Sequence, residues 1–235
     1  MSKLAVFFHA RISGGSMPIN ADGQRNVSVH PDVGRNQYVE QMKLMVDSGL
    51  YDAANEIHIG LNGEGDDEQF VQEHMPVGCI LHVHGAQAVS LLPTMRLLQD
   101  WLPGHEDYLV GFAHMKGVTH PHDPFKLAWR ACLERHVIKG WKDCVWLLEN
   151  GHEAVGCHWV KGTDEGRPVE FFGGVFWWST ARFLLTLPPL IEKCETRAQW
   201  YVPEFFIGSG PRTPTIFDFH PGWPNQIGCE RSANK

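Results

Sequence analysis

The chain has 235 residues, of which 43% are hydrophobic and 20% charged, a balance typical of a globular domain and not of a disordered or membrane protein. Its net charge of −7 gives no overall attraction for polyanions, which disfavours nucleic acid as a ligand or acceptor. The six cysteines contain no C-x-x-C pair, so we expect buried thiols. The length suits one domain over residues 1–235. Because we find neither a signal-peptide pattern nor an apolar stretch of about 18 residues, we expect a cytoplasmic protein with no membrane span.

The first half of the chain alternates strand and helix patterns. A continuous apolar run at 4–10 predicts a buried parallel strand, and the Gly-, Ser- and Pro-rich stretch 11–35 predicts a long functional loop. A 3.6-residue apolar period predicts a helix over 36–48 that ends at Gly49. We then expect strands at 56–63 and 79–85 with an acidic loop between them, a helix over 94–102 and a strand over 108–117.

The second half predicts helix over 124–148 with a break at Gly140, and then a strand over 154–160. The run FFGGVFWWST at 171–180 predicts a glycine-hinged aromatic segment that leads into a helix over 181–187, closed by two prolines. The tail after Gly208 has no periodicity, so we expect an irregular C-terminal arm.

This alternation predicts an α/β fold of the Rossmann-like type, with a mostly parallel central sheet flanked by helices. In such folds ligands bind outside the carboxyl ends of the strands. The densest set of polar residues at such an end is HMKGVTHPH at 114–122. Gly117 would let the backbone come close to a ligand, and Lys116 would place a compact cation where a phosphate could bind. The alternative is a solvated lysine on a loop.

A second candidate is a metal site on the strand LHVHG. His82 and His84 are two residues apart on a strand, so they share one face, as two metal ligands can. Asp66, Asp67 or Asp123 could complete such a site, although no closed ligand signature can be assembled from the spacing. The alternative is a pair of hydrogen-bonded histidines in the core or at its rim.

The aromatic segment and the run WYVPEFFIGSG supply the remaining candidates. Trp177 and Trp178 alternate faces if extended, so we expect one ring in the core and the other at a cleft, where it could stack on a sugar. Glu204 lies among apolar residues, where burial would raise its pKa and suit it to act as a general base. The alternative is a Glu in the first turn of a helix. Three further tryptophans, Trp101, Trp141 and Trp146, are expected in the core.

In this order, these motifs resemble a group of small bacterial and viral glycosyltransferase-like proteins. Their pattern is H-x-K-G-x-x-H, W-R, V-G-x-N-W, F-S-G-N-F-W-W and E-x-W-I-G, and the resemblance covers the chain from residue 4 to about residue 210. The sequence departs from that pattern at four positions. Gly173 and Val175 replace Ser and Asn, His158 replaces Asn, and Phe206 replaces Trp.

The resemblance implies a GT-A glycosyltransferase that uses a nucleotide sugar, which we expect to be UDP-linked, and a hydroxyl acceptor on a glycan, a lipid or another molecule. Where that fold commonly has an Asp-x-Asp that binds Mn or Mg, this chain has His114 and Lys116. We expect Lys116, helped by His114 or His120, to neutralise the diphosphate leaving group, and Glu204, or else Asp123, to be the base. The expected donor-binding residues are His9, Ala10, Arg11, Asn62, Gly63, His114, Lys116, Gly117, His120 and Arg130. The expected acceptor-binding residues are Gly173, Gly174, Trp177, Trp178 and His158.

Two other interpretations stay open at this point. One is a metal-dependent hydrolase built on His82, His84 and His120. The other is a catalytically silent domain that binds a nucleotide sugar or a carbohydrate, since the missing Asp-x-Asp could equally mark a lost activity.

Overall fold

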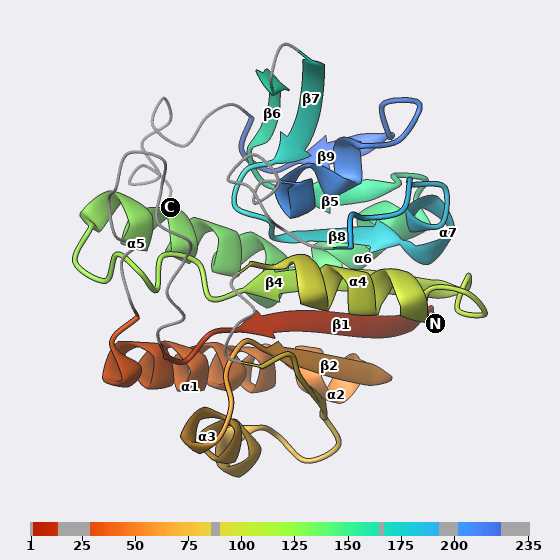
Figure 1. Cartoon of the computed structure of the whole chain (residues 1–235). Helices are drawn as coiled ribbons and strands as arrows, with labels where there is room; N and C mark the ends of the chain where they lie inside the picture. The colour runs from red at the N-terminus through yellow and green to blue at the C-terminus, as the bar shows by residue number, and fades with distance from the viewer. Residues whose placement is uncertain (1, 14–28, 86–89, 165–166, 193–201, 222–235) are drawn as a thin grey trace.

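The computed structural model describes residues 2–13, 29–85, 90–164, 167–192 and 202–221. Its main sheet has the strand order β3-β2-β1-β4-β8-β5-β9 (Figure 1). The first four strands run parallel, and β8 runs antiparallel to both of its neighbours. The predicted Rossmann-like α/β fold with a mostly parallel sheet is confirmed. The strands are β1 (Lys3–Ala10), β2 (Glu56–Leu61), β3 (Ile80–Val83), β4 (Tyr108–His114), β5 (Ala154–Gly156), β8 (Trp177–Thr180) and β9 (Ile216–Asp218).

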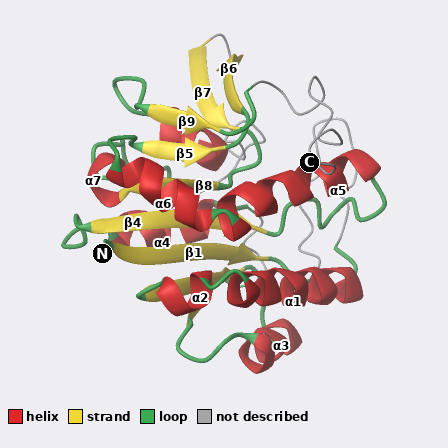
Figure 2. Ribbon diagram, turned by 180° about the vertical axis from the view of Figure 1, so that it is seen from behind, coloured by secondary structure: helices red, strands yellow, loops and turns green. Residues whose placement is uncertain are grey.

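Helices cover both faces of this sheet, which explains the continuous burial of β1. Alternate β1 side chains enter different cores, with Val6 and Phe8 in one cluster and Ala5 and Phe7 in the other. Because each face is covered, the strand needs apolar residues at every position. The first face carries α1 (Pro31–Asp47), α2 (Leu50–Ala53), α5 (Pro124–Leu133) and α6 (Trp141–Glu149), and the second carries α4 (Leu92–Trp101) and α7 (Ala181–Leu184) (Figures 1 and 2). Among the described residues, no helix has the length and apolarity needed to cross a bilayer.

Two stretches predicted as loops contain helices. Helix α1 begins at Pro31, inside the stretch 11–35, because a proline at the first helical position has its φ already set for a helix. Residues 14–28 of that stretch lie outside the described residues. The acidic run after β2 forms α3 (Asp66–His74), whose first-turn carboxylates favour the positive end of the helix dipole and whose Val71 is buried. Gly49 ends α1 with φ +72°, as predicted.

The helical stretch 124–148 is confirmed, and Gly140 marks a change in its winding. Between α5 and α6 the backbone forms a π-helix, η1 (Glu134–Lys139), in which the Gly140 amide donates to the Arg135 carbonyl at 3.0 Å. Wide turns of this kind are rare and insert one extra residue into a helix. Such a turn shifts the side chains that follow it relative to those of α5.

The predicted strand over 154–160 is two strands. It ends as β5 at Gly156, and β6 (Trp159–Asp164) pairs with β7 (Arg167–Phe172) in a separate two-stranded sheet. The break falls at His158, whose φ is +61°, a conformation that side chains rarely adopt. The Asp218 carboxylate accepts hydrogen bonds from the amides of His158 and Trp159 at 2.8 and 2.7 Å and so stabilises the kink.

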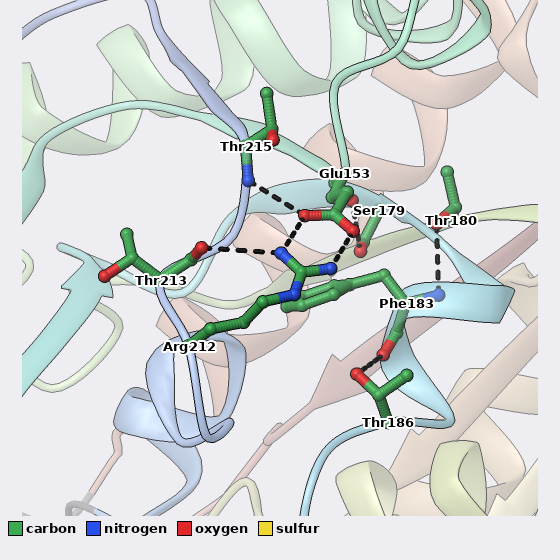
Figure 3. A network of polar contacts seen from close by, with 8 residues as sticks. All are labelled: Glu153, Ser179, Thr180, Phe183, Thr186, Arg212, Thr213 and Thr215. Carbon is green, nitrogen blue, oxygen red and sulfur yellow. Dashed lines mark hydrogen bonds and ion pairs between the residues drawn. The ribbon is translucent and has the colours of Figure 1, made fainter.

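The C-terminal arm is only partly irregular, because β9 joins the edge of the main sheet beside β5. A polar network fixes the chain before it (Figure 3). Arg212 forms two hydrogen bonds to the Glu153 carboxylate, and the Thr215 amide donates to the same carboxylate at 2.9 Å. A three-residue strand between prolines is too short to show alternation, which is why the sequence pattern did not predict it. Residues 222–235 lie outside the described residues.

The aromatic segment belongs to the core. Trp177 and Trp178 point to opposite faces of β8, as predicted, but each ring is 1% exposed and each enters one of the two cores. The expectation that one of them lies at a cleft is wrong, because both sides of the sheet are covered. The expected core position of Trp146 is also wrong, since it is 61% exposed on α6.

Candidate active site

The candidate site lies where the order of the parallel strands reverses. β2 pairs with one side of β1 and β4 with the other, and His9, the residue before the end of β1, is the register partner of His114, the last residue of β4. Such switch points leave a crevice outside the carboxyl ends of the strands. A cavity of about 260 Å³ opens there, lined by His9, Arg11, Ser90, Leu91, His114, Met115, Lys116, Gly117, Val118, Thr119, His120, Lys126 and Glu204.

The charged residues of this cavity are mostly cationic, in contrast to the net charge of the whole chain. Arg11, Lys116 and Lys126 face a single carboxylate, Glu204, among the described lining residues. The Lys116 ammonium lies 4.1 Å from the centre of the Trp129 ring and that of Lys126 lies 5.0 Å from it, both within the range of a cation–π interaction. Burial lowers the pKa of Lys116, and Glu204 opposes that shift. The cavity therefore suits an anion.

The loop that carries Lys116 is held by its own backbone. Gly117 has φ +75°, and the His120 amide donates to its carbonyl at 2.8 Å. From α1, the Gln37 side-chain amide donates to the Lys116 carbonyl at 3.1 Å. The turn at 114–120 is thus tied to a helix, which limits the positions that the Lys116 side chain can take.

The histidines at the strand ends are uncharged at neutral pH. Burial lowers the pKa of His9 far below its ordinary value, that of His84 to about 4 and that of His114 to about 3. The Thr94 hydroxyl lies 2.7 Å from Nδ1 of His9 and 3.1 Å from Nε2 of His84, and His114 donates from Nε2 to the Gly174 carbonyl at 2.8 Å. His114 therefore supplies no positive charge, contrary to its expected help to Lys116.

Glu204 reaches the cavity from η2 (Val202–Gly208), a 3₁₀-helix on the side of the sheet covered by α4. The buried side chains of Pro203 and Phe206 anchor this helix. Glu204 stands in its first turn, as the alternative interpretation expected, and its carboxylate also lines the cavity. Burial raises its pKa, while Lys116 and Lys126 act in the opposite direction. The result is one carboxylate that accepts a proton more readily than an exposed Glu does.

Several residues expected at the donor site lie outside the cavity. Asn62 is buried and donates to the Ser90 carbonyl at 3.0 Å, and Arg130 pairs at 3.6 Å with Glu134 one turn further along the helix. Ala10 is buried in the core, and Gly63 lies near Asp67. Asp123, which we expected as a second base, caps α5 by accepting from the Phe125 and Lys126 amides with its Oδ1 and does not line the cavity.

The expected acceptor residues form no surface. Gly173 and Gly174 are buried, and a side chain added at Gly174 would meet Leu133 at 2.6 Å and Trp129 at 3.4 Å. His158 is fully buried behind Trp129, and the Trp177 and Trp178 rings lie in the two cores. None of these side chains lines the cavity.

The described lining of the cavity does not fit Mg²⁺ or Mn²⁺. These cations take several oxygen ligands, usually carboxylates, whereas the lining offers one carboxylate among three cationic side chains. Asp67 is hydrogen bonded to the Ser13 hydroxyl instead.

The histidine site of the hydrolase interpretation is not assembled in the part of the chain that the structure describes. His82 contacts the His58 ring at 3.1 Å, His84 contacts Thr94, and His120 contacts the Thr119 hydroxyl at 2.8 Å. These three histidines thus have three different sets of neighbours. The interpretation that they are hydrogen-bonded residues of the core rim accounts for His82 and His84.

Lys126 is the charged residue of the described lining that the sequence pattern missed. It follows the cap of α5 by three positions, where a lysine is ordinarily solvated, and only the packing of α5 against the 114–120 turn brings it to the cavity. A Cβ on Gly117 would lie 3.4 Å from the Cβ of Lys126. A glycine at position 117 therefore indicated that another segment packs closely against this turn. The sequence did not identify that segment as α5.

Neither a family model nor a curated protein matches the sequence. Solved structures with a similar arrangement include a 4-diphosphocytidyl-2C-methyl-D-erythritol synthase, with 13% identity, a TM-score of 0.40 and coverage of 79% of this chain and 78% of that one. A putative nucleotide-diphospho-sugar transferase from Desulfovibrio desulfuricans G20 has 13% identity, a TM-score of 0.43 and coverage of 100% and 90%. Rv0371c from Mycobacterium tuberculosis H37Rv has 10% identity, a TM-score of 0.38 and coverage of 94% and 90%. Likenesses at this level transfer no activity to the chain.

Proposed function

We propose that the chain is a transferase that binds a nucleoside-diphosphate sugar in the cavity at the ends of β1 and β4 and transfers the sugar to a hydroxyl acceptor. The observation that carries the proposal is that, among the described residues, the cavity at the switch point of the sheet is lined by three cations, Arg11, Lys116 and Lys126, and one carboxylate, Glu204. A cationic pocket in a chain of net charge −7 selects for a compact anion and not for a polyanion.

The cations suit the leaving group of such a reaction. When the bond between the anomeric carbon and the diphosphate breaks, negative charge builds on the departing oxygen, and preorganised positive groups stabilise it. Lys116 is half-buried over Trp129 on a turn tied to α1, so little reorganisation is needed as the charge develops. Its lowered pKa reflects burial that an anionic ligand would offset.

Glu204 suits the other half of the reaction. The acceptor hydroxyl must lose its proton as its oxygen attacks the anomeric carbon, and a carboxylate with a raised pKa is a better proton acceptor than an exposed one. We assign this role to Glu204 because burial raises its pKa. The proton then passes from the acceptor oxygen to the Glu204 carboxylate, and the nucleoside diphosphate leaves with the bonding electron pair.

The first test is binding. Thermal unfolding is followed with UDP, GDP, CDP, ADP and their sugar conjugates, with and without manganese, for the wild type, Lys116→Ala and the exposed control Lys43→Ala. A ligand at about 100 times its Kd stabilises the folded chain by about 2.7 kcal/mol, so the wild type and Lys43→Ala should shift with one conjugate and Lys116→Ala much less. No shift across the panel, or equal shifts in all three proteins, contradicts the proposed site.

The second test is the product. With the conjugate that binds, the released compound is identified by anion-exchange chromatography during incubation with a mixture of hydroxyl acceptors. Release of the nucleoside diphosphate together with formation of a glycosylated acceptor agrees with transfer of the sugar, whereas release without an acceptor is transfer of the sugar to water. A second incubation contains a nucleoside triphosphate and a sugar phosphate instead of the conjugate. If it releases pyrophosphate, and the conjugate releases no nucleoside diphosphate, the reaction at this site is nucleotidyl transfer and not glycosyl transfer.

A further inference from the structure

A second cluster of reactive side chains lies behind the active-site cavity, on the far side of Trp129. One ligand atom each from Cys132, His136 and His220 lies within 4.8 Å of the other two. The Nε2 atoms of His136 and His220 are 3.0 Å apart. Three potential metal ligands from two distant parts of the chain therefore converge on one point.

Two more side chains border this cluster. His158 is fully buried, and its Nε2 lies 3.9 Å from the Cys132 sulfur. The Cys157 thiol is hydrogen bonded to that of Cys132. The surroundings thus offer imidazole nitrogens and thiol sulfurs. The Asp218 carboxylate beside them accepts hydrogen bonds from backbone amides.

The backbone holds the converging segments in place. Cys132 and His136 are four residues apart where α5 passes into the π-helix η1, so they share one face of the helix. The Asp218 carboxylate accepts from the amides of His158 at 2.8 Å and of His220 at 2.9 Å. It thereby fixes the end of β9 and the kink after β5 relative to each other.

We propose that Cys132, His136 and His220 bind a zinc ion, with His158 as the fourth ligand. A thiolate and imidazole nitrogens in a four-ligand set are the ligands that Zn²⁺ takes in structural sites, and hard cations such as Mg²⁺ avoid them. On binding, the Cys132 thiol releases its proton to solvent and its sulfur bonds to the ion, while the neutral histidines donate ring lone pairs. No electron is transferred, so no further reactant is required.

Such an ion would bind the C-terminal segment to the body of the domain. Cys132 and His136 belong to the α5–η1 helix, His158 follows β5, and His220 follows β9, the last described strand. The Trp129 ring lies between the cluster and the cavity. It contacts the Lys116 ammonium of the cavity, and its centroid lies 6.4 Å from that of the His158 ring in the cluster. The zinc site is therefore structural and independent of the proposed transfer reaction.

The test is metal content and cobalt spectroscopy of the full chain. The wild type, purified from zinc-supplemented medium and dialysed, should contain one zinc ion per chain by mass spectrometry. Replacement by Co²⁺ should give the near-ultraviolet thiolate-to-cobalt band and the visible bands of tetrahedral cobalt. His82→Ala is the matched control, because His82 belongs to the separate pair with His58, and it should keep both signals.

Cys132→Ser should lose the near-ultraviolet band, and His220→Ala should lower zinc affinity by more than the roughly 10–100-fold that loss of an outer-shell partner costs. The proposal is overturned if the wild type holds no zinc and gives no cobalt bands, or if His82→Ala loses the metal while His220→Ala retains it. If a variant fails to fold, the wild-type measurement decides alone. In addition, a chelator should lower the wild-type melting temperature, and an unchanged melting temperature after complete removal of zinc contradicts the structural role.

Discussion

The strand-end turn at 114–120 and the aromatic segment at 171–178 both stood out in the sequence, and the fold uses them in opposite ways. The turn lines the cavity, where Lys116 and His120 are accessible from it. The aromatic segment lies inside the protein, with both tryptophans 1% exposed. Aromatic density therefore marked the core, and polar residues after a buried strand marked the site.

The difference has a steric cause. Trp178 lies opposite Gly111 of β4, and a Cβ on Gly111 would come within 2.8 Å of the indole ring. The glycine leaves room for the ring between strand and helices, and the indole N–H donates to the Val137 carbonyl at 2.9 Å. The turn after β4 packs against α5, where Gly117 lies close to Lys126, and it also borders the cavity, so Lys116, Thr119 and His120 contribute to the cavity lining.

The sharpest test of the site is Glu204→Gln. Loss of a general base should lower the transfer rate by about 10²–10⁴-fold. Burial raises the pKa of Glu204 above its ordinary value of 4.5. The wild-type rate should fall as the pH drops through this pKa, because a protonated carboxyl group accepts no proton. The Gln variant should lack this acidic limb in a pH–rate profile, whereas the exposed Glu73→Gln should retain it. An unchanged limb in Glu204→Gln would assign the titration to another group.

The corresponding test of the aromatic segment is Trp178→Ala. Removing a fully buried indole should lower the free energy of unfolding by about 3–5 kcal/mol, measured by urea denaturation. Trp146→Ala, at a position 61% exposed, should change it by about 0.5 kcal/mol or less. Similar losses in the two variants would mean that the segment is not the core element described above.

Lys116→Ala should reverse the pattern of Trp178→Ala. Loss of one preorganised charge should reduce the transfer rate by about 10²–10³-fold, while the urea midpoint stays within the range of the Lys43→Ala control. The lysine is half-buried and its pKa is lowered by burial, so its removal takes away an unfavourable desolvation as well as its contact with Trp129. A large drop in stability with unchanged kinetics would make Lys116 a structural residue.

Gly111→Ala gives the smallest effect and tests the steric argument. The added methyl group would press on the Trp178 ring and should cost about 1–3 kcal/mol of unfolding free energy, as overpacking of a core does. The double variant Gly111→Ala/Trp178→Ala should lose less than the sum of the two single variants, because the clash disappears with the ring. Strict additivity in urea denaturation would show that the glycine is not there to make room for Trp178.

Much of the fold followed from local patterns. The parallel strands at 4–10, 56–63, 79–85 and 108–117, the helix end at Gly49 and the helical stretch over 124–148 correspond to observed elements, since burial on two faces and a 3.6-residue period leave strong signals. Helix α3 was missed because its acidic residues resemble a loop, and β9 because three residues show no alternation. The split at His158 depends on the distant Asp218 carboxylate.

The site was predictable to a similar extent. Lys116 and Gly117 follow a buried strand, and Glu204 lies in an apolar run, so both candidates were visible from their neighbours in the sequence. Lys126 was not, because on α5 it resembles any surface lysine. The expected acceptor residues lie in the core because a pattern of glycines and tryptophans does not distinguish a stacking surface from close packing.

The amino-acid sequence by itself determined the class of fold and the end of the sheet at which polar groups gather, because both depend on hydrophobic periodicity along the chain. Only the tertiary structure decided which polar groups meet. Lys116, Lys126 and Glu204 come from a turn, a helix and a 3₁₀-helix up to 88 residues apart in numbering (204 − 116), and His220 meets Cys132 and His136 although it is 84 residues from His136. Side-chain proximity across such distances is set by the packing of helices on a sheet, and local sequence does not encode it.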